Sequence, residues 1–199
     1  PKGSKTKTSP QGTFERPFNP GVLVIGAQGT FFARTLDTNP KAMTAVFLEA
    51  AKHKGTSVVE ILQNCVIFAN KTHDLITSRE TRDDNQLFVE HGKPLLFGKN
   101  KDKGIVLKGT KLEIVTLGEN GVTENDILVH DQFEKDPGVH SMLASMMPPE
   151  YPVALGVIRS VVSETFNDAM MASIEQEKEN SAIKTVDDLL NSGPTWVID

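Results

Sequence analysis

Cys65, the one cysteine in the 199 residues, is the side chain best suited to chemistry. It follows the apolar run 58–62, which is long enough for one buried strand, and the polar pair Gln63-Asn64. In open α/β sheets, ligands bind beyond the carboxyl ends of the strands. A single cysteine cannot form a disulfide within the chain. Cys65 is therefore a packing residue, a nucleophile or one ligand of a site that other segments complete. Its spacing alone favours packing, because free cysteine is among the most often buried residue types.

Glu60 places a carboxylate within this apolar run. A carboxylate in a buried strand has to be paired or protonated, because its charge is costly away from water. Glu60 is thus an active-site acid or a glutamate at a strand edge or on an exposed face. The second interpretation is favoured, because most glutamates in proteins are exposed.

A group of histidines and acids near residue 130 could be drawn as a metal site: His130, Asp131, Glu134 and His140. Their spacing matches no helical zinc motif such as H-E-x-x-H. The favoured interpretation is structural or solvated histidines. The sequence also contains no Gly-x-Ser-x-Gly nucleophile elbow and no P-loop.

The composition argues against several classes of protein. A net charge of −5 is opposite to the basic face of a general nucleic-acid binder. A single cysteine excludes a disulfide-stapled secreted scaffold and fits a reducing compartment, so we expect a cytoplasmic location. No apolar run reaches the length of a membrane-spanning helix, which predicts a soluble protein without membrane contact. The sequence opens in the style of a loop and without Met, and we expect a piece of a longer polypeptide.

The first half of the sequence predicts alternating helices and strands. Residues 1–18 are basic and lack an apolar period, which favours a solvated loop over a basic strap near an anionic cofactor such as coenzyme A. Asn19-Pro20 is a helix start, so we predict a short helix over 20–28 and a strand over 31–36. Asn39-Pro40 begins a second helix, and the strand that ends at Cys65 follows. This alternation is typical of a parallel α/β sheet.

The second half predicts a different organisation. We expect a loop over 70–85 and then short β runs up to residue 117, with a hairpin turn at 108–111. A methionine-rich helix over 139–147 and a strand over 153–162 come next, and the methionines fit core packing. Further helices are predicted over 166–178 and after a capping Thr185, and Trp196 is expected to pack the tail back.

Five segments of the sequence together resemble one known family. They read KTSPQGTFERPFNP, GTFFARTLDTNPKAMTAVFLEAAKHKGTSVVEILQNCVIF, EHGKPLLFG, ILVHD and PPEYPVALGVIRSV. In this order they are similar to the β subunit of the 2-oxoacid:ferredoxin oxidoreductases, of the 2-oxoglutarate synthase type. The resemblance covers essentially the whole chain.

The resemblance implies a fold and a division of the chain. The fold class is α/β, as part of a thiamine diphosphate-binding fold with a mostly parallel sheet, a small β excursion and a C-terminal helical tail. Residues 1–69 are then the C-terminal part of the thiamine diphosphate-binding domain. Residues 70–199 are the C-terminal region of the subunit.

The resemblance also implies an activity and partners. Such an enzyme oxidatively decarboxylates a 2-oxoacid on thiamine diphosphate and Mg²⁺, transfers the acyl group to coenzyme A, and passes electrons through a 4Fe–4S cluster to ferredoxin. Its β subunit works with an α subunit. The family's fourth cluster cysteine stands in the sequence context of Cys65, so the ligand interpretation now outweighs packing. We further expect Val66, Ile67 and Phe68 to form a dry shell around the cluster.

The family motifs that hold Mg²⁺ and the diphosphate, and its Cys-x-x-Cys pair, are not in this sequence. We therefore assign no catalytic residue and no thiamine-binding residue, and expect the chain alone to be inactive. A non-catalytic subunit-assembly module derived from the same subunit is the alternative. A third hypothesis is a nucleotide binder that uses Gly26 and Gly29, which requires a strand over 21–25.

Overall fold

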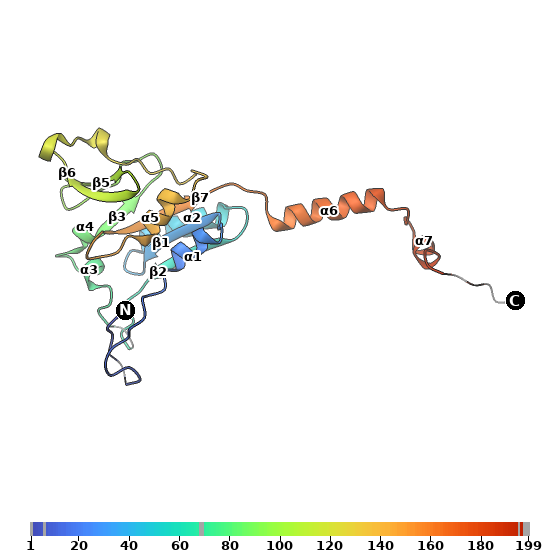
Figure 1. Cartoon of the computed structure of the whole chain (residues 1–199), viewed down its shortest axis with the longest axis horizontal. Coiled ribbons are helices and arrows are strands. Elements are labelled where there is room, and N and C mark those ends of the chain that lie inside the picture. Colours follow the sequence, from blue (N-terminus) through green and yellow to red (C-terminus); the bar gives the residue numbers. More distant parts are fainter. Residues whose placement is uncertain (1, 6, 68–69, 195, 197–199) are drawn as a thin grey trace. The chain divides into compact units, whose positions relative to one another are not determined.

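The computed structural model describes residues 2–5, 7–67, 70–194 and 196 (Figure 1). The chain divides into two compact units, Pro1–Val162 and Ser163–Asp199. The domain boundary expected at residue 69 falls on a residue outside the described ranges and stays a prediction.

The first unit is built on a four-stranded sheet in the order β2-β1-β7-β3, so β2 lies at one edge. Its strands are β1 (Phe31–Leu36), β2 (Ser57–Leu62), β3 (Gln86–Val89) and β7 (Val153–Ser160). β1 runs parallel to β2, and β3 runs parallel to β7, whereas β1 and β7 are antiparallel. The predicted α/β class with a mostly parallel sheet is therefore confirmed.

The two Asn-Pro pairs begin helices as predicted. α1 (Pro20–Gly26) starts with the side chain of Asn19 accepting a hydrogen bond from the amide of Val22 at 3.1 Å. α2 (Pro40–Lys52) starts in the same way at Asn39. Because α1 occupies the segment where a nucleotide-binding strand would have to lie, the nucleotide-binder hypothesis is wrong.

A second sheet forms the predicted β excursion. Its strands, in the order β4-β5-β6, are β4 (Leu96–Phe97), β5 (Lys103–Lys108) and β6 (Lys111–Thr116). Lys108 pairs with Lys111, so the predicted hairpin turn is confirmed. Short 3₁₀ turns follow at η1 (Glu119–Gly121) and η2 (Glu124–Asp126). The loop predicted over 70–85 instead contains the four-residue helices α3 (Asp74–Thr77) and α4 (Arg82–Asn85), which are too short and polar to show an apolar period.

The main hydrophobic core joins both sheets to α1 and to a helix near residue 143. It includes the buried side chains of Phe32, Leu87, Ile105, Leu143 and Ile158. Leu143 belongs to α5 (Gly138–Ser145), the methionine-rich helix of the sequence. Met146, just after this helix, is buried in the same core, in agreement with its predicted packing role.

The second unit contains two capped helices, α6 (Phe166–Asn180) and α7 (Val186–Leu190). The prediction that Trp196 packs the tail back is wrong, because this side chain is 81 % exposed. No helix in the described part of the chain is both long and apolar enough to span a membrane.

Candidate functional site

Cys65 lies beyond the carboxyl end of β2 and is half-buried. The strand ends at Leu62, three residues earlier than predicted, and Leu36 at the end of β1 pairs with Leu62. The two parallel strands thus end side by side, close to the turn that carries the thiol. Val66 and Ile67, after the cysteine, are exposed in this chain, and Phe68 lies outside the described residues. The dry shell expected around a cluster stays a prediction.

Asn64, the residue before Cys65, ties the turn to the next segment. Its side-chain oxygen accepts a hydrogen bond from the backbone amide of His73 at 2.7 Å. Its side-chain amide lies 3.5 Å from a carboxylate oxygen of Asp74, at the start of α3. The start of α3 is therefore held close to the turn before Cys65.

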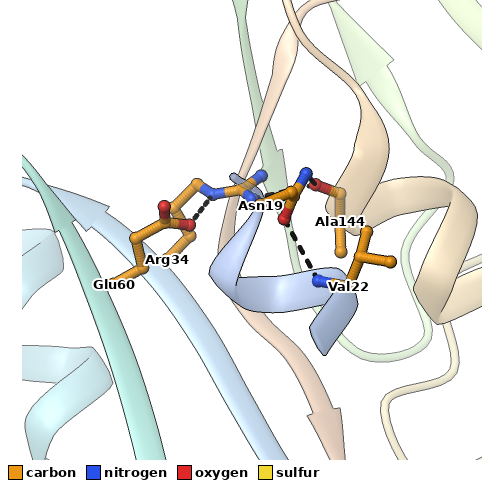
Figure 2. Close-up of polar contacts among 5 residues, drawn as sticks. All are labelled: Asn19, Val22, Arg34, Glu60 and Ala144. Atoms are coloured by element: carbon orange, nitrogen blue, oxygen red, sulfur yellow. Dashed lines mark hydrogen bonds and ion pairs between the residues drawn. The ribbon is translucent and has the colours of Figure 1, made fainter. Parts of the chain in front are cut away.

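An ion pair joins β1 and β2 at the neighbouring residues Arg34 and Glu60 (Figure 2). Nε of Arg34 donates to Oε2 of Glu60 at 2.6 Å. The Arg34 side chain is 0 % exposed and that of Glu60 is 16 % exposed. Glu60 is thus paired, as a carboxylate in a buried strand must be, and it belongs to an edge strand, but its side chain is not on an exposed face.

Arg34 also anchors the end of α5. Its Nη2 donates to the carbonyl oxygen of Ala144 at 2.9 Å, and the side-chain amide of Asn19 donates to the same oxygen at 3.0 Å (Figure 2). Nη1 of Arg34 is buried and has no hydrogen-bond partner among the described residues. Arg34 and Asn19 thereby connect the ion pair, the start of α1 and the end of α5.

Glu60 faces a pocket of about 570 Å³. Arg16, Asn19 and His73 supply other polar groups, and most of the wall is apolar, including Phe18. The size and the mixture of apolar wall with a few polar groups are typical of small-molecule sites.

His73 is the titratable group beside Glu60 in this pocket. Partial burial lowers the pKa of His73, while the charges of Asp37 and Glu60 act to raise it. Burial dominates, so His73 is neutral at pH 7. The pocket therefore offers a fixed carboxylate, held by Arg34, next to a neutral imidazole.

Sequence reasoning missed both Arg34 and His73. Arg34 is the single charged residue in the strand FFARTL, and it stands in register with the single charged residue of SVVEIL. Two adjacent apolar strands with one opposite charge each are a signal for a cross-strand pair, provided that the pairing is known. His73 had no such signal, because it follows a loop.

The histidines near residue 130 are structural, as favoured. Nε2 of His130 lies 2.9 Å from the carbonyl oxygen of Val157, and Nε2 of His140 lies 2.8 Å from that of Asp131. Nδ1 of His140 lies 2.9 Å from Nη1 of Arg159. Since an arginine can only donate, this nitrogen of His140 is the acceptor and the ring is neutral. In the described ranges, no group of three or more His, Cys, Asp or Glu residues could hold a metal ion.

The sequence matches a known protein along nearly its whole length. No family model matches the sequence. The chain is 32 % identical over 200 residues to the 2-oxoglutarate oxidoreductase subunit KorB of Mycobacterium tuberculosis, and the alignment covers 99 % of this chain and 53 % of that protein. The chain is related to the 2-oxoacid:ferredoxin oxidoreductase β subunits. The resemblance seen in the sequence is therefore confirmed.

Shorter matches carry the same family names. A segment is 43 % identical over 65 residues to the 2-oxoglutarate synthase subunit KorB of Archaeoglobus fulgidus, covering 33 % of this chain and 24 % of that protein. Another is 35 % identical over 63 residues to the 2-oxoacid:ferredoxin oxidoreductase subunit beta of Saccharolobus solfataricus, covering 32 % and 21 %.

A solved structure supports the fold. It is the 2-oxoglutarate:ferredoxin oxidoreductase of Magnetococcus marinus, with 2-oxoglutarate, coenzyme A and succinyl-CoA bound. The TM-score is 0.61 at 14 % identity, and the match covers 98 % of this chain and 50 % of that one. This chain thus spans about half the length of the M. tuberculosis relative and of the solved chain.

Proposed function

We propose that this chain is part of an oxidoreductase that oxidatively decarboxylates a 2-oxoacid to an acyl-CoA and CO₂. 2-Oxoglutarate is the favoured substrate and pyruvate is the alternative. The observation that carries the proposal is the identity of 32 % to a 2-oxoglutarate oxidoreductase subunit along 99 % of this chain. The enzyme would work in the cytoplasm, with ferredoxin as the electron acceptor and an α subunit as the partner chain.

In this proposal, Cys65 is one ligand of a 4Fe–4S cluster. Such clusters are held by cysteine thiolates, usually four. This chain contains one cysteine, so its own residues fit a share of the site and not the whole of it. The position of Cys65 beyond a strand end, in a turn fixed by Asn64, supports this role because a ligand needs a defined direction.

Thiamine diphosphate with Mg²⁺ would supply the carbanion chemistry of the decarboxylation. The described residues offer no acidic cluster for Mg²⁺, and we assign none of them to this cofactor. What the chain itself supplies is a pocket wall with a carboxylate acceptor, Glu60. The buried guanidinium of Arg34 fixes the direction of the Glu60 carboxylate, which can orient a hydrogen-bond donor of a bound molecule.

The test is Cys65→Ser in the assembled complex, with iron content, cluster absorbance and ferredoxin reduction as the measurements. We expect the variant to lose most of its cluster iron and its ferredoxin reduction. Gln63→Ser is the matched control, because it changes an exposed side chain two residues before the cysteine and should keep both. Full iron content and ferredoxin reduction in Cys65→Ser would overturn the ligand role and favour the assembly module.

A further inference from the structure

The helix α6 has a stripe of apolar side chains along one face. Phe166, Met170 and Ile174 follow one another at a spacing of four residues, which places them on one side of a helix. Their exposed fractions are 81 %, 44 % and 39 %. The shorter helix α7 has exposed apolar side chains as well, at Val186, Leu189 and Leu190. The second unit therefore presents apolar surface from both of its helices.

The sequence specifies α6 although the helix buries none of its residues. The side chain of Thr165 accepts from the amide of Asp168 at 3.1 Å at its start, and Lys178 pairs with Glu175 in its last turns. An isolated helix of this length is marginal in water, and most helices in proteins are stabilised by packing of an apolar face. The apolar stripe of α6 is thus a packing surface whose partner lies outside the second unit.

The net negative charge of the second unit indicates a partner surface with basic groups. Residues 163–199 contain eight acidic residues and two basic ones, a net charge of −6, whereas the whole chain has −5. The first 162 residues are therefore nearly neutral. An acidic helix is repelled by anionic membranes, where interfacial helices are rich in Lys and Arg. It is attracted to a protein groove with a basic rim.

We propose that α6 docks through Phe166, Met170 and Ile174 into an apolar groove with a basic rim on the α subunit. This inference rests on the proposed function, which supplies the partner. The 99 % alignment takes in most of this acidic segment, and the aligned relative is named as a subunit of a larger enzyme. Helix-in-groove recognition uses apolar anchors at this spacing, and the charges around them set orientation and association rate.

The experiment measures binding of the full chain to the purified α subunit, by titration calorimetry at two salt concentrations. The variant Phe166→Ala/Met170→Ala/Ile174→Ala keeps helix propensity and removes the anchors. We expect its Kd to rise at least about 50-fold, since buried anchors dominate such interfaces. The control Ala172→Ser/Gln176→Ala changes the opposite face and should bind as the wild type does. Higher salt should weaken wild-type binding.

The outcomes separate this inference from the proposed function. If the wild-type chain does not bind the α subunit, the partner in the proposed function is wrong and the docking falls with it. If the wild type binds and the triple alanine variant binds equally well, the docking role of α6 alone is overturned. It is also overturned if the triple variant loses self-association, or binding to vesicles of anionic lipid, in place of α-subunit binding. Amide protection of α6 that appears only in the wild-type complex would support it.

Discussion

Arg34 and Glu60 form an ion pair across β1 and β2, with Nε and Oε2 2.6 Å apart and the arginine fully buried. Each residue of the pair has a second contact or role. Arg34 also donates a hydrogen bond to the end of α5, and Glu60 lines the pocket. It therefore links the packing of the unit to the wall of the candidate site.

We predict that Glu60→Gln destabilises the chain by about 3 kcal/mol, because it leaves a buried guanidinium without a counter-charge. Arg34→Met combined with Glu60→Leu should recover most of this loss, since replacing both charges with apolar side chains of similar volume is often nearly neutral. Urea unfolding of the single and double variants measures both effects. A loss below about 0.5 kcal/mol for Glu60→Gln would show that the pair contributes little to stability.

Asn19 has two roles, whereas Asn39 has one. Both cap a helix, but the side-chain amide of Asn19 also donates to the carbonyl oxygen of Ala144. We expect Asn39→Ala to cost about 1 kcal/mol and Asn19→Ala about 2 kcal/mol in free energy of unfolding. Equal costs in denaturant titrations would mean that the bond to Ala144 adds nothing.

The pH dependence of the free energy of unfolding should include a contribution from the protonation of His140. Burial lowers the pKa of this ring, as does the charge of Arg159, while its hydrogen bond to the Asp131 carbonyl and the charges of Asp131 and Glu134 act to raise it. With a folded pKa below the unfolded value of about 6.5, the unfolded chain binds more protons in acid. The contribution of His140 to stability is therefore fully present above about pH 6.5 and is lost as the pH decreases toward the folded pKa.

His140→Gln should reduce this dependence, because glutamine does not titrate. Unfolding free energies measured between about pH 7 and pH 5 check the prediction, and Ser141→Ala, the neighbouring change, should keep the wild-type slope. His130 is buried with its pKa lowered mainly by burial, so His140→Gln leaves a smaller slope in the same direction. An unchanged slope in His140→Gln would contradict the assignment to this ring.

Gly156 is a position where β7 tolerates no side chain. Its φ is +117°, and an added Cβ would lie 2.6 Å from the carbonyl oxygen of Val89 on the adjacent strand. We expect Gly156→Ala to destabilise the chain by at least about 2 kcal/mol. Gly26→Ala is the matched control, because an added Cβ there meets nothing and the change should be neutral or slightly stabilising. Thermal unfolding of both variants gives the comparison.

Local signals in the sequence predicted the local structure. The Asn-Pro pairs at 19 and 39 fixed two helix starts, and the apolar runs identified β1 and β2, because capping and periodicity depend on neighbouring residues. The position of β7 beside β1 could not be predicted, since it depends on pairing across more than 100 residues. The burial of Arg34 follows from that arrangement, because α5 covers it only in the folded unit.

The candidate site was predictable to a smaller extent. The place of Cys65 beyond a strand end followed from the strand pattern. The pocket beside Glu60 could not be predicted, because its wall comes from loops and from residues far apart, such as Phe18 and His73. The error at Trp196 has a physical cause. A large aromatic residue suggests packing, but the sequence of a short tail does not indicate whether its packing partner belongs to the same chain; here Trp196 is exposed.

The edge position of β2 has a practical consequence. An edge strand leaves a row of amide and carbonyl groups that other strands can join, and Ile61 on this strand is also exposed. When this polypeptide is expressed alone, the β2 edges of different copies can pair with one another and aggregate. The non-aggregated fraction should then fall as the expression level rises. Co-expression of a polypeptide that covers β2 should restore this fraction.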